Sequence, residues 1–133
     1  MYEYKIKEIV RVVDGDTVDI SIDLGFNLTK KERVRVAGID TPESRTSDGD
    51  EKKFGIEAKI VIERKLREAE VLTIKTEKDG KYGRMLGWIY ADGSSVSINQ
   101  LMIDEGYAWA YDGGKKEKDF AELLEKRGKV EIV

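Results

Sequence analysis

The chain has 133 residues, the length of one domain, and its 24 basic and 27 acidic residues give a formal charge of −3. It contains no cysteine and no histidine, which excludes disulfides, thiolate chemistry and every mechanism built on an imidazole. Acid–base chemistry is therefore left to carboxylates, lysine, tyrosine or metal-bound water. We expect a single domain over residues 1–133.

The acidic balance bears on the class of partner. A nucleic-acid binder that uses no metal is usually basic, so an anionic partner needs a local cluster of cations or a bound cation here. The sequence has no apolar run of transmembrane length and no signal segment at its start. We expect no membrane partner, and an intracellular protein or a processed or trimmed secreted form. Nothing calls for an obligate oligomer, so a monomer is expected.

The N-terminal half alternates apolar and polar residues with the period of two that is typical of strands. This pattern covers residues 4–12, 18–23 and 33–36. Two more strands are predicted at residues 71–75 and 85–90, joined by the turn-rich residues 78–81. The pattern thus indicates about five short strands.

Three helices fit the remaining chain, at residues 56–69, 98–105 and 118–127. Apolar residues recur at helical spacing in the first. Ser97 and Gly106 are a good N-cap and stop for the second, and Gly128 is expected to stop the third. Because the strands arrive consecutively, the sequence favours an α+β, mainly β fold: a small antiparallel barrel with helices packed on it.

The segment "VDGDTV", residues 13–18, has two interpretations. Asp14-Gly15 is a strong turn signal, so a tight turn between strands explains it without any site. A calcium loop of the EF-hand kind is excluded, because Val18 and Gly25 stand where that loop needs an oxygen ligand and a glutamate.

The segment "DTPE", residues 40–43, contains the only proline of the chain. Asp40 and Glu43 have the spacing of a helix capping box, and proline is favoured in a first helical turn. The alternative is a rigid corner that aims its neighbours at a site. The segment "KYGR", residues 81–84, reads as a solvated basic turn or as a place where Tyr82 packs or stacks.

These segments indicate more together than separately. Asp16 and Asp40 are hard oxygen ligands that suit calcium or magnesium, and Glu43 is a further carboxylate. Arg35 and Arg84 carry planar forks that match phosphate oxygens. A hard cation, a carboxylate base and two arginines are the parts needed to attack a phosphodiester.

The same motifs carry a resemblance to a known family. "VDGDTV", "RVAGIDTPE", "FGIEA" and "DGKYGRMLGWIYADG", in this order and spacing, resemble the staphylococcal (thermonuclease-type) nuclease family from about Val10 to Gly106. The resemblance implies a five-stranded OB-fold barrel with three helices. It also implies a calcium-dependent endonuclease or exonuclease that cleaves DNA and RNA, leaving 3′-phosphate and 5′-hydroxyl ends.

The resemblance further implies a role for each matching position. The calcium ligands are expected at Asp16, Asp40 and the backbone carbonyl of Thr41, the general base at Glu43, and the phosphate-binding arginines at Arg35 and Arg84. Whether Glu43 acts as the base or organises the site structurally stays open.

Substrate contacts are implied at Lys81 and Tyr82, toward a terminal phosphate and sugar, and at Tyr111, by stacking on a base. Tyr111 lies where the chain aligns poorly with the family, and packing against the last helix explains it equally well. Lys115 and Lys116 form a substrate rail or, as we favour, a solvated charge run. The type member is strongly basic whereas this chain is acidic, which affects affinity more than chemistry.

Two other functions stay open. OB-fold barrels commonly bind single strands, so a catalytically inactive binding module is the main alternative. Such a module is expected to have lost some of the five charged side chains, and all are present. A protein-interaction or structural domain explains each motif separately but not their joint presence, and it gains ground if calcium leaves stability unchanged.

Overall fold

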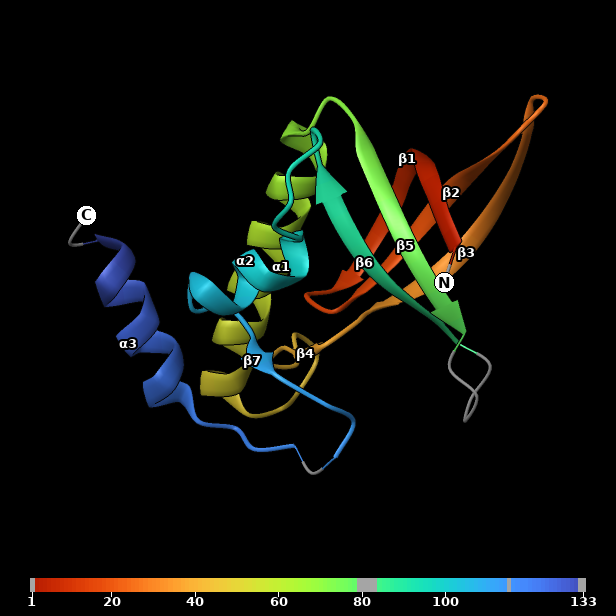
Figure 1. The fold of residues 1–133 in the computed structure, drawn as a ribbon. Helices are drawn as coiled ribbons and strands as arrows, with labels where there is room; N and C mark the ends of the chain where they lie inside the picture. The colour runs from red at the N-terminus through yellow and green to blue at the C-terminus, as the bar shows by residue number, and fades with distance from the viewer. Residues whose placement is uncertain (1, 79–83, 115, 132–133) are drawn as a thin grey trace.

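The computed structural model describes residues 2–78, 84–114 and 116–131 (Figure 1). The elements follow one another as β1 (Tyr2–Asp14), β2 (Thr17–Gly25), β3 (Leu28–Val36), β4 (Ile39–Asp40), α1 (Gly49–Glu68), β5 (Leu72–Lys78), β6 (Met85–Ala91), α2 (Ile98–Asp104), β7 (Trp109–Ala110) and α3 (Phe120–Glu131). The predicted fold class, a five-stranded barrel with three helices, is confirmed.

The barrel closes in the strand order β1-β2-β3-β6-β5, and four of its five junctions are antiparallel. The fifth, between β3 and β6, is parallel, with Arg35 opposite Leu86. We expected an antiparallel barrel throughout. An odd number of strands cannot alternate in direction around a closed ring, so one pair has to run parallel.

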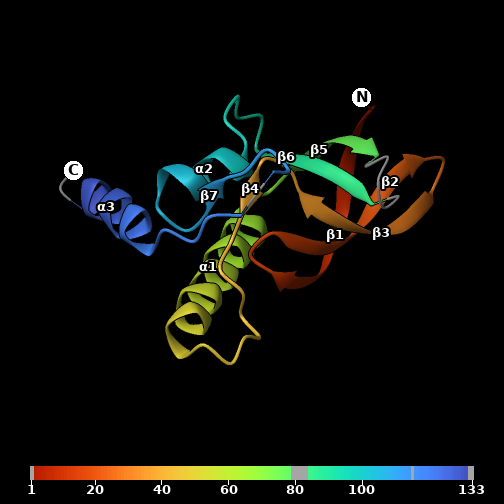
Figure 2. The same cartoon turned by 90° about the horizontal axis from the view of Figure 1, so that it is seen from below.

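The barrel interior is filled by the apolar residues of the alternating pattern, among them Val18, Ile20, Val34, Ile74 and Ile89, all fully buried. α1 packs against the barrel with the face that carries Ala58, Ile62 and Leu66. Figure 2 shows the helices gathered on one side of the molecule, with the short strands β4 and β7 beside them, and the barrel strands on the other. The core therefore fills the barrel and continues to the inner face of α1.

Helix boundaries differ from the prediction in α1 and α3. α1 begins at Gly49, seven residues before the predicted residue 56, because the Asp48 side chain caps it by accepting hydrogen bonds from the backbone N–H groups of Asp50 and Glu51. α3 begins at Phe120 and runs past Gly128 to Glu131, so the predicted glycine stop is wrong.

α3 lies beyond α1 and α2, apart from the strands (Figure 1). Its Phe120 ring contacts the rings of Phe54, at a centroid distance of 4.8 Å, and Trp109, at 5.5 Å. Its Phe120 therefore packs on α1 and on the short strand β7, which lies outside the barrel. No helix in the described part of the chain is both long and apolar enough to cross a membrane.

Candidate active site

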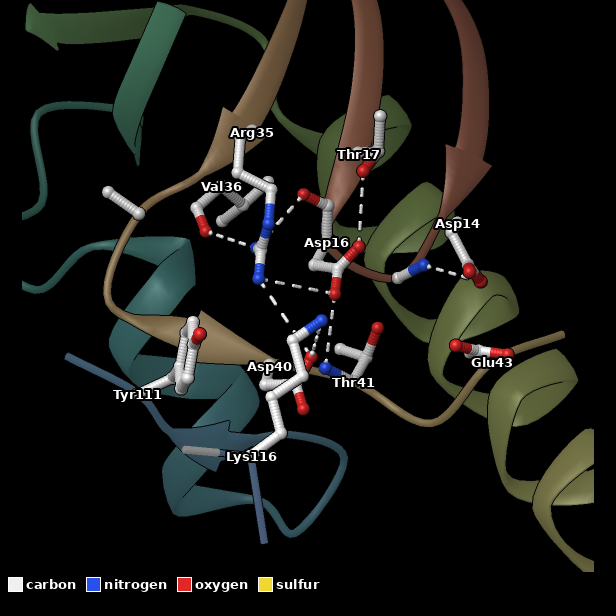
Figure 3. Close-up of polar contacts among 12 residues, drawn as sticks. Asp14, Asp16, Thr17, Arg35, Val36, Asp40, Thr41, Glu43, Tyr111 and Lys116 are labelled. Carbon is white, nitrogen blue, oxygen red and sulfur yellow. Dashed lines mark hydrogen bonds and ion pairs between the residues drawn. The ribbon is translucent and has the colours of Figure 1, made fainter. Parts of the chain in front are cut away.

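A hollow of about 210 Å³ opens at one end of the barrel, where the β1–β2 turn, the end of β3, β4 and two loops meet (Figure 3). Ten residues line it: Asp14, Asp16, Thr17, Arg35, Asp40, Thr41, Glu43, Arg84, Lys116 and Lys118. The five charged side chains singled out in the sequence are all among them. The structure thus brings together residues from segments that are far apart along the chain.

The β1–β2 turn places Asp16 because Gly15 allows a close approach. A Cβ at Gly15 would lie 2.9 Å from side-chain atoms of Thr41 and of Ala58 in α1. The turn therefore lies directly against the segment after β4, where the Asp16 carboxylate accepts a hydrogen bond from the Thr41 backbone N–H at 3.2 Å. The interpretation as a turn and the interpretation as a site are both compatible with this geometry.

Arg35 is fixed at the end of β3. One guanidinium nitrogen donates to the backbone carbonyl of Val36 at 2.9 Å and, more weakly, to that of Asp16 at 3.4 Å. The other lies 3.6 Å from the Asp16 carboxylate and 3.9 Å from that of Asp40. Only 13% of the Arg35 side chain is exposed, so its fork is oriented before any ligand arrives.

Asp40 lies in β4, where it pairs with Trp109 of β7, and it is almost fully buried. It does not cap a helix, because α1 starts at Gly49 with Asp48 as its cap, so the capping-box interpretation of "DTPE" is wrong. Burial raises the pKa of Asp40 and the charge of Asp16 adds to this, while Lys116 and Arg35 oppose it.

Asp14 is one of four carboxylates that line the hollow, with Asp16, Asp40 and Glu43. Burial raises its pKa, a hydrogen bond with Ser44 opposes the rise, and the nearby charge of Asp16 adds to it. The hollow thus groups four carboxylates at one end of the barrel, beside four cationic side chains that balance their charge.

Glu43 stands exposed at the rim of the hollow, and α1 holds its backbone. Its N–H donates to a buried Glu51 carboxylate oxygen at 3.1 Å. A Cβ at Gly55 would lie only 2.4 Å from the Glu43 carbonyl group, so this glycine is required for the contact. The buried Pro42 thus makes a corner that rests on α1 and directs Glu43 outward.

The sequence did not single out Glu51 and Lys118, and it offered Lys116 as part of a substrate rail only as the less favoured interpretation. The Lys118 ammonium lies 2.9 Å from the Glu51 carboxylate, and this hydrogen bond is the main reason why the pKa of Lys118 is raised. The Lys116 ammonium lies 3.5 Å from the Asp40 carboxylate although its side chain is 52% exposed, so a solvated lysine is also ion-paired with the site. An acid in a first helical turn is common, so Glu51 gave no distinctive signal.

Arg84 and the predicted substrate-contact residues differ in how far the structure places them at the hollow. Lys81 and Tyr82 fall outside the described residues, and so does Lys115. Arg84 is exposed just before β6 and lines the hollow. Tyr111 donates its hydroxyl to the Gly114 carbonyl at 2.8 Å and lines a neighbouring hollow of about 200 Å³ with Asp40 and others. It therefore stands beside the candidate site, and its stacking role stays a prediction.

The residues at the hollow fit a hard divalent cation. Asp16 and Asp40 supply carboxylate oxygens near one guanidinium nitrogen, and the charge of Asp16 helps to raise the pKa of Asp40. The buried Thr41 hydroxyl has no hydrogen-bond partner within the described ranges. No three His, Cys, Asp or Glu side chains there are grouped to hold a metal by themselves, so carbonyl and water oxygens would complete the shell.

Comparisons with known proteins agree with the geometry. The family model described as "Staphylococcal nuclease homologue" matches residues 33–130. A micrococcal nuclease of Shigella flexneri is 36% identical over 111 residues, which are 78% of this chain and 57% of that protein. An uncharacterized endonuclease of Escherichia coli O157:H7 is 32% identical over 104 residues, 78% of this chain and 60% of its own length.

Protein ParB of Escherichia coli is 32% identical over 111 residues, covering 78% of this chain and 56% of that protein. The chain therefore spans less than two thirds of the length of the curated relatives that it matches.

Proposed function

The chain belongs to the staphylococcal nuclease family, and we propose that it is a calcium-dependent nuclease that cleaves DNA and RNA with little sequence specificity. The proposed products carry 3′-phosphate and 5′-hydroxyl ends. The observation that carries the proposal is the convergence of Asp16, Arg35, Asp40, Glu43 and Arg84 on one hollow.

In this proposal the arginines bind the phosphate at which cleavage occurs. Arg35 is held by two backbone carbonyls, so its guanidinium needs little rearrangement to meet phosphate oxygens. Arg84 approaches from the start of β6. Together they stabilise the negative charge that builds on the equatorial oxygens as phosphorus becomes five-coordinate.

Asp16, Asp40 and the Thr41 carbonyl are the proposed calcium ligands. When bound, calcium supplies a Lewis acid that neutralises charge on a phosphate oxygen. Because Lys116 lies 3.5 Å from the Asp40 carboxylate and is half exposed, its long side chain can withdraw when the carboxylate gains another partner.

Glu43 is the proposed general base. Its exposed carboxylate accepts a proton from a water molecule, whose oxygen attacks phosphorus. The bond from phosphorus to the 5′-oxygen breaks, the 5′-oxygen is protonated from solvent, and the phosphate stays on the 3′-oxygen. Lys81, Tyr82 and Tyr111 are proposed to contact the rest of the nucleotide.

The test is digestion of single-stranded DNA and of RNA with calcium and with a chelator, followed by typing of the ends. New 5′-hydroxyl ends accept a labelled phosphate from polynucleotide kinase without prior dephosphorylation. The proposal predicts calcium-dependent cleavage that yields such ends. Folded protein that binds the strand without cleaving it would favour the inactive binding module instead.

A further inference from the structure

A second, larger hollow lies on the outer face of α1. It measures about 570 Å³ and is lined by Ser44, Arg45, Ile56, Lys59, Ile60, Glu63, Arg64 and Arg67. The six helical positions recur at intervals of three and four, so they form one stripe along α1. The buried residues Ala58, Ile62 and Leu66 lie on the opposite face. We call this surface the α1 groove.

The α1 groove is strongly cationic although the whole chain is acidic. Four of its lining residues are basic and one is acidic. Arg67 lies 3.6 Å from Glu63, but Arg45, Lys59 and Arg64 have neither an ion pair nor a side-chain hydrogen bond with any described residue. Unpaired cations that line one concave surface are available for an anionic ligand.

The α1 groove adjoins the candidate active site through residues 43–45. Glu43 lines the hollow at the barrel end, and Ser44 and Arg45 line the groove. Ser44 is buried and hydrogen-bonded to Asp14, which also lines the catalytic hollow. A ligand can therefore extend from one hollow to the other across this short segment.

We propose that the α1 groove binds the sugar–phosphate backbone of the substrate strand outside the nucleotide that is cleaved. The inference rests on the proposed function and supplies the local cluster of cations that an acidic nucleic-acid binder needs. Lys59, Arg64 and Arg45 contact successive phosphates. The exposed aliphatic side chains of Ile56 and Ile60 give an apolar floor for sugars and base faces.

An anionic membrane is the other partner that a basic helix face can bind. A membrane-bound helix needs a broad apolar face to bury among the lipids, and this stripe offers only Ile56 and Ile60 as exposed large apolar residues. The α1 groove is concave and adjoins the hollow at the barrel end, and both features favour a nucleic-acid strand over a membrane surface.

The experiment measures binding of a fluorescent 20-nucleotide single-stranded DNA, by anisotropy, to the full chain in a chelator so that no cleavage occurs. The test variant is Lys59→Ala with Arg64→Ala, and alanine preserves helix propensity. The matched control is Lys31→Glu, which changes the net charge equally at an exposed site of β3 that does not line the α1 groove. Dissociation constants are measured across a salt series.

The proposal predicts that the double variant binds about tenfold more weakly at low salt. The plot of log affinity against log salt concentration should become less steep by about 1.4, the loss of two phosphate contacts. Lys31→Glu should keep the slope. The proposal is overturned if the double variant keeps the wild-type slope, or if the wild type does not bind the strand at low salt. Binding of both proteins to phosphatidylserine vesicles is measured in parallel. The proposal is also overturned if the double variant binds these vesicles more weakly than the wild type but binds the DNA strand equally well.

Digestion with calcium separates this inference from the proposed function. If the wild type cleaves DNA but the double variant keeps the wild-type slope, the groove assignment fails and the function stands. If the slope falls but the wild type never cleaves, the function fails and the assignment of the groove to a nucleic-acid strand stands.

Discussion

The two sides of the hollow at the barrel end, the candidate active site, are built in different ways. On the barrel side, Asp16, Arg35 and Asp40 lie at strand ends, with side chains that are 14%, 13% and 6% exposed. On the loop side, Glu43 and Lys116 are exposed, and they lie on segments held by contacts with α1 and with Asp40.

This difference separates two ways of positioning charge. Strand ends fix the barrel-side groups through backbone hydrogen bonds, so these groups are suited to act on charge that develops in the transition state. The loop-side groups depend on tertiary contacts, chiefly through Glu51 and Gly55. We therefore expect barrel-side substitutions to affect catalysis directly, and substitutions at Glu51 and Gly55, which support the loop side, to act through position and stability.

The largest effect is expected at Arg35. Arg35→Ala removes a preorganised donor to the transition state and should lower kcat by about a hundredfold to a thousandfold. Steady-state digestion of single-stranded DNA measures it. Arg33→Ala is the matched control, because Arg33 lies on the same strand, is exposed and pairs with Asp19 away from the hollow. Similar losses in both variants would remove Arg35 from the site.

A smaller effect on catalysis is expected at Glu51. Glu51→Gln weakens the ion pair with Lys118 and disturbs the acceptor for the Glu43 N–H, so kcat should fall by about tenfold. Glu51 is a positioning residue, so Lys118→Met should produce part of the same loss and the double variant should be less than additive. Full additivity would contradict a shared role, and the exposed Glu68→Gln serves as the control.

Gly55 tests whether α1 supports the Glu43 segment. Gly→Ala inside a helix normally stabilises by about 1 kcal/mol. At this position the new Cβ would lie 2.4 Å from the Glu43 backbone, so Gly55→Ala should instead destabilise the protein by about 1–3 kcal/mol. Denaturant unfolding measures it. Gly49→Ala, where a Cβ meets open space in the same helix, should be close to neutral. A stabilising Gly55→Ala would contradict the contact.

The smallest effect is expected at Asp14, where burial and the charge of Asp16 raise the pKa above its ordinary value of 3.8. The folded state then binds the proton more tightly than the unfolded state, so ionisation of Asp14 lowers stability at neutral pH. Asp14→Asn should raise the midpoint of thermal unfolding slightly at pH 7 without calcium. The gain should disappear below the ordinary pKa, where both states are protonated, and a gain that grows in acid would contradict it.

Much of the fold follows from local patterns. The alternation around Val18 and Val34 predicts barrel strands, and the cap at Ser97 predicts the start of α2, as the structure confirms. The early start of α1 was missed because its first turns are polar and lack an apolar period, so only the Asp48 cap marks them. Gly128 failed as a stop because glycine weakens a helix without ending it.

The residues of the candidate site also divide into those that local sequence patterns predict and those that they do not. Asp16 and Arg35 lie at the ends of strands with clear patterns, so their convergence could be expected from a barrel, whereas Asp40 lies in β4, a two-residue strand that no pattern predicted. Lys116 and Glu51 enter the region through ion pairs with Asp40 and Lys118, residues distant in sequence. No local pattern encodes such contacts. The roles of all the site residues stay predictions until they are measured.

Calcium binding and DNA cleavage, measured together on the wild type and on Asp40→Asn, test the central claim most directly. Calorimetry gives the affinity for calcium, and digestion with calcium or a chelator gives the activity. The account predicts that the wild type binds calcium and cleaves only in its presence, and that Asp40→Asn loses most of both. Cleavage that continues in the chelator, or an Asp40→Asn protein that binds calcium and cleaves like the wild type, would contradict it.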